Sequence, residues 1–153
     1  MQIADLDAGW RELLAAAEEA REQAYAPYSR FPVGAAVRTG DGAVYSGANI
    51  ENAVYGLTAC AERVALWKAV SEGEREFEAL AVVTRTGSTP CGSCRQVMAE
   101  FAPRMAVLVA DTEGGAWLTS VAALLPHSFG EEDLERAYGE DRGQDETRTA
   151  ADQ

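Results

Sequence analysis

Two short stretches that hold all three cysteines of the chain must meet in space, and this requirement constrains the fold more than any other feature. They are Cys60-Ala61-Glu62-Arg63 and Pro90-Cys91-Gly92-Ser93-Cys94. The two thiolates of a Cys-x-x-Cys pair can bind the same ion, and Cys60 can supply a third thiolate from the other stretch. Three protein ligands leave the fourth position of a tetrahedral zinc ion for water. We therefore predict one catalytic Zn²⁺ per chain, bound by Cys60, Cys91 and Cys94.

Two other interpretations of the cysteines compete with this one. Free cysteines are often small core residues, but that role does not account for the spacing. A structural zinc site is usually closed by four protein ligands. The only other soft ligand is His127, the single histidine, which lies in a different motif and which we expect to be structural or on the surface. An open metal site is the better interpretation.

Glu62 follows Cys60 by two residues, a spacing that places a carboxylate beside the metal without making it a ligand. The pattern Cys-Ala-Glu followed by Pro-Cys-x-x-Cys resembles that of the zinc deaminases, in which the glutamate shuttles protons. The resemblance implies that Glu62 is the catalytic general acid and base. A solvated position on a helix is the usual alternative for a glutamate, but it leaves the spacing unexplained.

Three further motifs extend the resemblance to most of the chain. They are Tyr28-Ser29-Arg30-Phe31-Pro32-Val33-Gly34-Ala35-Ala36, Asn49-Ile50-Glu51-Asn52 and Leu124-Leu125-Pro126-His127-Ser128-Phe129-Gly130. In this order, together with the cysteine motifs, they resemble the small nucleoside cytidine deaminases over roughly residues 20 to 136. The resemblance implies zinc-dependent hydrolysis of cytidine and 2'-deoxycytidine to uridine and 2'-deoxyuridine, with release of ammonia, in pyrimidine salvage.

Several residues near the metal motifs are candidates for binding the substrate. Asn49 and Glu51 point the same way if their segment is extended. Taken alone they indicate a capped loop with a solvated acid, whereas the resemblance makes binding of the sugar hydroxyls their expected role. Phe31 can stack on the pyrimidine ring or pack between strands. The backbone of Ala61 can bind the edge of the base.

Positive charge is needed around three thiolates, because their excess negative charge makes a zinc-bound water a weaker acid. The starts of two helices, at Cys60 and Cys91, place partial positive charge near the sulfurs. Arg63, one turn after Cys60, can donate to a ligand sulfur or form a salt bridge with a nearby acid. For Arg95 we expect a solvated side chain with no role beyond its position next to Cys94.

The charge of the chain argues against a nucleic-acid substrate. The net charge is −12, half of it in the segment 131–153, and no run of basic residues occurs. Polynucleotides bind through clusters of Lys and Arg, so a small, nearly neutral nucleoside is the expected partner. The longest uncharged stretch, 114–130, has 17 residues and contains Pro126, so it is too short and too broken for a membrane span. With no signal-peptide pattern and an odd number of cysteines, we expect a cytoplasmic location.

The hydrophobic pattern predicts one α/β catalytic domain over residues 1–138, followed by an acidic, disordered tail over 139–153. We expect helices over 8–24, 60–72, 91–101, 121–125 and 131–138, and strands over 33–38, 43–48, 79–83, 106–110 and 116–120. Strands that alternate with helices indicate a three-layer α/β/α sandwich around a mixed, mostly parallel five-stranded sheet. The resemblance implies the same three-layer fold.

The resemblance also implies a homotetramer in which Tyr55 and Phe129 reach the pocket of a neighbouring subunit, whereas the sequence alone would place both in the core. Three other functions remain open. A deaminase of a modified or antibiotic cytosine nucleoside, of the blasticidin type, shares the zinc motif but lacks an Asn-x-Glu-Asn stretch of this kind. Editing of RNA or DNA is disfavoured by the charge. A non-catalytic zinc-binding module is disfavoured by Glu62.

Overall fold

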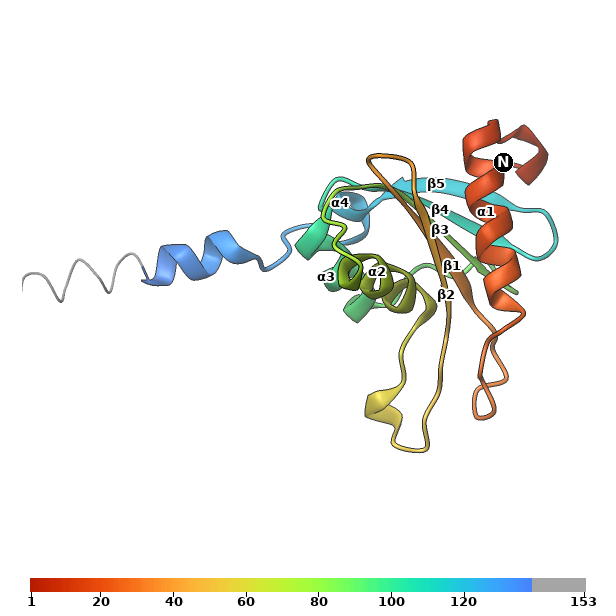
Figure 1. Cartoon of the computed structure of the whole chain (residues 1–153), viewed down its shortest axis with the longest axis horizontal. Helices are drawn as coiled ribbons and strands as arrows, with labels where there is room; N and C mark the ends of the chain where they lie inside the picture. The colour runs from red at the N-terminus through yellow and green to blue at the C-terminus, as the bar shows by residue number, and fades with distance from the viewer. Residues whose placement is uncertain (139–153) are drawn as a thin grey trace, which may run out of the picture.

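The computed structural model describes residues 1–138, and the predicted tail over 139–153 lies outside the described residues. Every helix and strand predicted from the hydrophobic pattern is present, with ends shifted by at most a few residues (Figure 1). The helices are α1 (Ala8–Arg21), α2 (Ala61–Ser71), α3 (Gly92–Phe101), α4 (Val121–Leu124) and a helical segment over 131–138, with two unpredicted 3-10 turns, η1 (Ile3–Asp5) and η2 (Tyr55–Leu57). The strands are β1 (Gly34–Thr39), β2 (Val44–Ala48), β3 (Phe77–Thr84), β4 (Ala106–Asp111) and β5 (Ala116–Ser120).

The five strands form one mixed sheet in the order β2-β1-β3-β4-β5. The prediction of a mostly parallel sheet is wrong, because β3 and β4 are the only neighbouring strands that pair in parallel. Hairpins make the β1–β2 and β4–β5 pairs antiparallel. Helix α2 carries the chain across β1, so β3 runs in the direction of β2 and antiparallel to the strand between them. Alternation of strands and helices along the chain does not reveal that β1 lies between β2 and β3.

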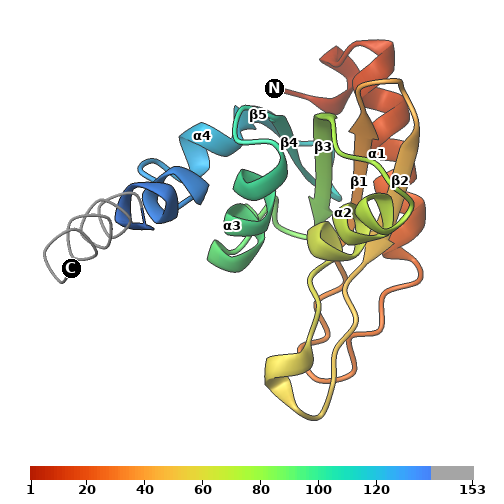
Figure 2. The same ribbon diagram turned by 60° about the vertical axis from the view of Figure 1, so that its left-hand side comes forward.

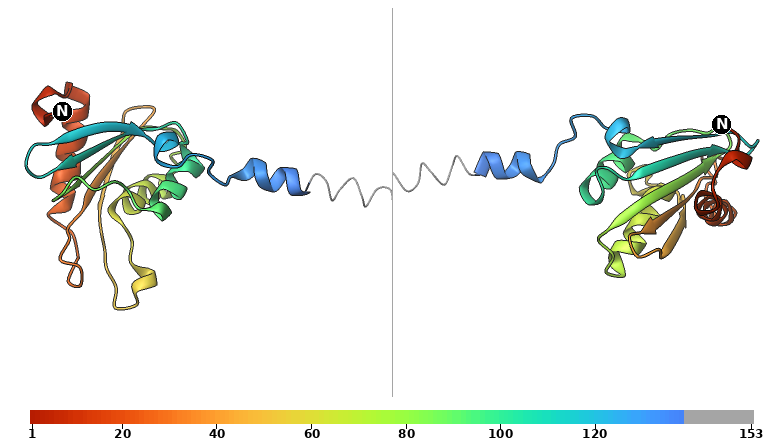
Figure 3. Two further views of the ribbon diagram at one scale, coloured as in Figure 1. Left: turned by 180° about the vertical axis from the view of Figure 1, so that it is seen from behind. Right: turned by 90° about the horizontal axis from the view of Figure 1, so that it is seen from above.

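Helices cover both faces of the sheet, which gives the three predicted layers (Figures 1 and 3). Helix α1 packs on one face through Leu13, Leu14 and Ala17. Helices α2 and α3 pack on the other face, where Leu66 and Met98 are fully buried. Central strand β3 is covered on both faces, which explains why its sequence is continuously apolar from Ala79 to Val83. The helical segment over 131–138 extends away from these layers (Figure 3).

Local signals fix the ends of several elements. Asp7 caps α1, since its Oδ1 accepts a hydrogen bond from Trp10 N at 3.0 Å. Gly42 takes a φ of 94° in the turn between β1 and β2, a conformation that favours glycine. The amino group of Met1 donates to Ala116 O at 2.9 Å and so ties the start of the chain to β5. Among residues 1–138, none of the helices combines the length and apolar character needed to cross a bilayer.

Gly47 in β2 allows α2 to lie close against the sheet. A Cβ atom at this position would lie 2.6 Å from Ala65 N and 2.8 Å from Val64 Cγ1. The first of these is a backbone atom of α2, so the helix itself would have to move to relieve the contact. Because α2 begins directly after Cys60, this close approach also determines where the first cysteine motif lies.

We predict that Gly47→Ala lowers the free energy of unfolding by about 1–3 kcal/mol, because the added methyl group pushes α2 away from the sheet. Urea denaturation followed by circular dichroism measures this change. Gly40→Ala is the matched control, since a Cβ atom there would lie 3.5 Å or more from its neighbour Glu76, an ordinary van der Waals contact, and it should unfold at the wild-type urea concentration. A wild-type midpoint for Gly47→Ala would contradict the prediction.

Candidate active site

The three cysteines predicted to bind zinc converge at the starts of α2 and α3, which lie on the same face of the sheet (Figure 2). Cys60 and Cys91 are the N-cap residues of the two helices, and Cys94 lies in the first turn of α3. Cys91 Sγ is 3.8 Å from Cys60 Sγ and 3.5 Å from Cys94 Sγ. All three thiols are free, and the sulfurs lie within 4.8 Å of one another.

The spacing and chemistry of these sulfurs fit a zinc ion. Two sulfurs bound at about 2.3 Å to one tetrahedral zinc are about 3.8 Å apart, close to the separations observed. Thiols are soft ligands that suit zinc, and a set of three leaves one coordination position for another molecule. Cys94 is buried, Cys60 is half-buried and Cys91 is exposed, so the cluster faces solvent on the Cys91 side.

Arg63 contacts the thiol cluster from one turn further along α2. Its Nη2 donates to Cys60 Sγ at 3.6 Å and to Thr58 O at 3.0 Å. The guanidinium carbon lies 5.4 Å from the centre of the Trp67 ring, a cation–π distance. Its Nε atom is buried and has no hydrogen-bond partner among residues 1–138. Hydrogen bonds at one edge and an aromatic ring against its face therefore hold the guanidinium beside Cys60.

The thiols differ in how readily they ionise. Hydrogen bonding with Cys94, and then with Arg63 and Cys91, lowers the pKa of the Cys60 thiol to about 5, although partial burial opposes this effect. The same interaction with Cys60, together with burial, raises the pKa of the Cys94 thiol. The Cys60 thiol therefore ionises more readily than the Cys94 thiol, because hydrogen bonds stabilise the Cys60 thiolate whereas burial disfavours that of Cys94.

Glu62 is the second residue of α2, and only 5% of its surface is exposed. Burial is the main cause that raises the pKa of its carboxyl to about 7, and the negative charge of Cys60 adds to the effect. An unperturbed glutamate has a pKa of about 4.3. A group with a pKa near neutrality can both accept and release a proton at neutral pH. The fold thus places a group suited to proton transfer beside the thiol cluster.

Asn49 bridges two backbone groups of the loop between α1 and β1. Its Nδ2 donates to Phe31 O and its Oδ1 accepts from Val33 N, both at 2.9 Å. The amide therefore pairs with this loop as a neighbouring strand would, and it fixes the backbone on both sides of Pro32. Phe31 is half-buried at this position. Asn49 thus has the loop-capping role that the Asn-x-Glu pattern indicates by itself.

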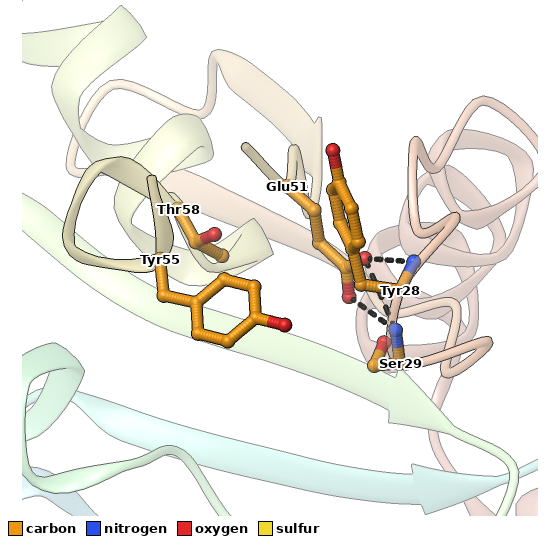
Figure 4. Close-up of a pocket in the computed structure, with 5 residues that line it drawn as sticks. All are labelled: Tyr28, Ser29, Glu51, Tyr55 and Thr58. Carbon is orange, nitrogen blue, oxygen red and sulfur yellow. Dashed lines mark hydrogen bonds between the residues drawn. The ribbon is translucent and has the colours of Figure 1, made fainter. Parts of the chain in front are cut away.

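Glu51 organises the same loop and lines an open pocket of about 420 Å³ (Figure 4). Its carboxylate accepts from Tyr28 N at 2.8 Å and from Ser29 N at 3.2 Å. Hydrogen bonding with Ser29 is the main reason that the pKa of Glu51 is lowered, so the group is ionised at neutral pH. Tyr55 and Thr58 line the opposite side of this pocket. Thr58 also connects the pocket to the thiol cluster, because its carbonyl accepts from the Arg63 side chain that contacts Cys60.

The other predicted residues lie in different environments. Ala61 is fully buried as the first residue of α2. Tyr55 and Phe129 are 76% and 60% exposed, so the core position that the sequence alone indicates is wrong for both. Each lies in a segment that extends from the layered domain, and neither belongs to a strand or a long helix. His127 is exposed, in agreement with a surface role.

Arg95 and Gln96, for which the sequence predicts no role, also belong to the region around the cysteines. Arg95, expected to be solvated, is half-buried and hydrogen-bonds three oxygen atoms. Gln96 Nε2 donates to Phe129 O at 2.8 Å. Their only signal in the sequence is their position directly after Cys94. Their partners on the 124–129 segment lie about thirty residues away, which no local pattern can reveal.

Known proteins of similar sequence identify the family of this chain. A sequence model of the cytidine and deoxycytidylate deaminase zinc-binding region matches residues 10–110. A cytidine deaminase of Sporosarcina psychrophila is 54% identical over 129 residues, which are 82% of this chain and 95% of that protein. The crystal structure of cytidine deaminase from Burkholderia pseudomallei matches with a TM-score of 0.76 and 51% identity, over 78% of this chain and 98% of that one.

A blasticidin-S deaminase of Bacillus cereus is a more distant relative. It is 32% identical over 111 residues, which are 66% of this chain and 79% of that protein. The match to the cytidine deaminase of Sporosarcina psychrophila is both longer and higher in identity. Because the zinc-binding region matches from residue 10 to 110 and this relative is more than half identical, the chain belongs to the cytidine deaminase family and has zinc as its cofactor.

Proposed function

We propose that this enzyme deaminates free cytidine and 2'-deoxycytidine, and that Glu62 moves the protons of the reaction. The supporting observation is a buried carboxyl, with its pKa raised to about 7, beside three convergent thiols. A zinc-binding module without activity gains nothing from a carboxyl in this position. The products are uridine or 2'-deoxyuridine and ammonia.

The metal would be held by Cys60, Cys91 and Cys94, and when bound it would supply a water molecule activated for attack at neutral pH. Glu62 accepts a proton from the attacking water and transfers it to N3 of the cytosine ring, which makes C4 electrophilic. After the oxygen has added to C4, Glu62 carries the second proton to the exocyclic amino nitrogen. The C4–N bond then breaks and ammonia leaves. One carboxyl serves both transfers, because each proton passes through it and none is consumed.

Arg63 is assigned to offset the negative charge of the thiolates. Three thiolates carry more negative charge than one Zn²⁺ neutralises, and the excess weakens the activation of water. The hydrogen bond from Arg63 Nη2 to Cys60 Sγ withdraws charge from one sulfur. The positive ends of α2 and α3 act on the same group of sulfurs.

The sugar is assigned to the pocket that Glu51 lines. Each carboxylate oxygen can accept more than one hydrogen bond, so Glu51 can bind a hydroxyl while it holds the loop. Asn49 has a second amide hydrogen that can donate to the sugar, and it fixes the backbone of Phe31. Phe31 would then face the pyrimidine ring, and the backbone at Ala61 the edge of the base.

A homotetramer that works in the cytoplasm, in pyrimidine salvage, is the proposed biological form. Four apolar side chains are at least half exposed in the segment 50–57, namely Ile50, Val54, Tyr55 and Leu57. Such a cluster on the surface of one chain is typical of a protein interface. Phe129, also exposed, would enter the pocket of a neighbouring subunit. Three reduced thiols that bind a metal fit a reducing compartment.

We predict that Glu62→Gln lowers kcat for cytidine by at least about 100-fold, because the amide keeps the shape of the side chain but cannot shuttle protons. Steady-state kinetics measures the loss, and metal analysis should still find one zinc per chain. Glu72→Gln, at the exposed end of the same helix, is the control and should keep the wild-type kcat. Near-normal turnover by Glu62→Gln would falsify the assignment.

We predict that cytidine and 2'-deoxycytidine are far better substrates than cytosine, since the free base lacks the hydroxyl groups that Glu51 binds. Ammonia release is measured for these three compounds, for blasticidin S and for a single-stranded oligonucleotide. Glu51→Gln should lower kcat/KM for cytidine by about 10- to 100-fold, the value of a hydrogen bond to a charged group. Turnover of cytosine should change much less. Equal turnover of cytosine and cytidine by the wild-type enzyme would remove the reason for a sugar site.

We predict a tetramer in sedimentation experiments at micromolar concentration, with Phe129 acting between subunits. Phe129→Ala should then be poorly active as a pure protein. Mixed tetramers of Phe129→Ala and Glu62→Gln subunits should be more active than the sum of the two variants, because some sites receive both wild-type side chains. Tetramers of Glu62→Gln and Cys91→Ser subunits are the control and should gain nothing, since both changes lie within one subunit's site. A fully active monomer would rule out shared sites.

A further inference from the structure

The guanidinium group of Arg95 hydrogen-bonds three oxygen atoms from two separate parts of the chain. Its Nε donates to Pro90 O at 2.7 Å, and its Nη2 donates to Thr89 Oγ1 at 2.8 Å. Its Nη1 donates to Leu124 O, at the end of α4, at 2.9 Å. Every one of these partners is an oxygen atom, which distinguishes Arg95 from Arg63 with its contact to a thiol. The Arg95 side chain therefore binds two backbone carbonyl groups and one hydroxyl group, and these hydrogen bonds involve no sulfur.

We infer that Arg95 is a positioning residue of the metal centre, which fixes the turn that carries Cys91 and fastens it to α4. The inference concerns how zinc is held, and it does not depend on which nucleoside the enzyme deaminates.

Cys91 is the thiol that most needs such support. It is the exposed member of the cluster, whereas Cys94 is buried in α3. A buried thiol is held by the atoms packed around it, but an exposed thiol is placed mainly by its own backbone. Arg95 binds the carbonyl of the residue directly before Cys91 and the side chain of the one before that. The distance from Cys91 Sγ to Cys94 Sγ, 3.5 Å, thus depends on a backbone turn that Arg95 closes.

The contact with α4 connects this turn to a second segment. The last carbonyl groups of a helix lack partners within the helix, and Arg95 satisfies that of Leu124. Gln96, the next residue, donates to Phe129 O at the other end of the same segment. Two consecutive residues of α3 therefore hold both ends of the segment 124–129. The start of α3 therefore holds both the turn that carries Cys91 and the loop that carries Phe129.

The geometry requires an arginine and not simply a positive charge. The three acceptors surround different nitrogens of one planar group, and all three bonds are 2.9 Å or shorter. A lysine has one compact ammonium group, which cannot reach three acceptors spread around a planar fork. Substitution by lysine should therefore behave more like removal of the side chain than like the wild type.

The test measures zinc retention by the zinc-loaded, full-length protein. Zinc release to 4-(2-pyridylazo)resorcinol is followed for Arg95→Met, Arg95→Lys and Thr89→Val. Arg104→Met is the matched control, because Arg104 is exposed beyond the end of α3. Absorption of the Co²⁺-substituted proteins, in the thiolate-to-metal charge-transfer region, reports on the arrangement of the sulfurs. Urea denaturation shows whether each variant remains folded.

We expect both Arg95 variants to release zinc at least about 10-fold faster than the wild type, the range found for residues that orient metal ligands. Their cobalt spectra should differ from that of the wild type. Thr89→Val should release zinc about 5-fold faster, which is the loss of one hydrogen bond, and Arg104→Met should match the wild type. A folded Arg95→Met or Arg95→Lys protein with wild-type zinc release and cobalt spectrum overturns the inference. If the Arg95 variants do not fold, wild-type release by Thr89→Val overturns it.

Discussion

Three thiol groups that repel one another once ionised lie within 4.8 Å of each other, and the rest of the site is arranged around that charge. The fold brings the positive ends of two helices to the same place, since Cys60 and Cys91 are their N-cap residues. Arg63 adds a full charge at Cys60, and the Trp67 ring holds its guanidinium in position. A bound metal ion would neutralise most of the remaining negative charge of the thiolates. Without this convergence of helix ends, three thiolates in one place would oppose folding.

Close packing fixes the position of Cys60 and Glu62. Glu62 and Cys60 belong to the start of α2, and Gly47 lets that helix approach β2 without an intervening side chain. The carboxyl has a raised pKa because it is buried, and the helix that carries it packs closely against the sheet at Gly47. Loops, in contrast, form the pocket that Glu51 lines, and hydrogen bonds between their backbone and the side chains of Asn49 and Glu51 keep them in place. Rigid elements thus hold the thiols and Glu62, and loops fixed by hydrogen bonds surround the pocket.

The sequence predicts most of this arrangement where the signal is local. The helices and strands follow from hydrophobic periodicity, and the thiol cluster and Glu62 follow from the spacing of the two cysteine motifs. The sheet order does not follow, because the insertion of β1 between β2 and β3 is a long-range pairing. The roles of Asn49 and Arg95 depend on backbone partners 16 to 29 residues away, which carry no side-chain signature. Residue type alone predicts that Tyr55 and Phe129 lie in the core, yet both are exposed. The exposure of an aromatic ring depends on the tertiary fold, which no local pattern reveals.

The placement of every cysteine in one cluster has a practical consequence. A reagent that counts reactive thiols finds no background elsewhere in the chain, because Cys60, Cys91 and Cys94 are its only cysteines. Bound metal protects all three sulfurs together, and after loss of the metal the exposed Cys91 should react first and the buried Cys94 last. Under denaturing conditions, where all three can react, the number of thiols titrated is therefore a measure of the fraction of molecules that carry zinc. For the same reason oxidative damage to cysteine cannot spare the active site, so the enzyme has no harmless thiol to lose.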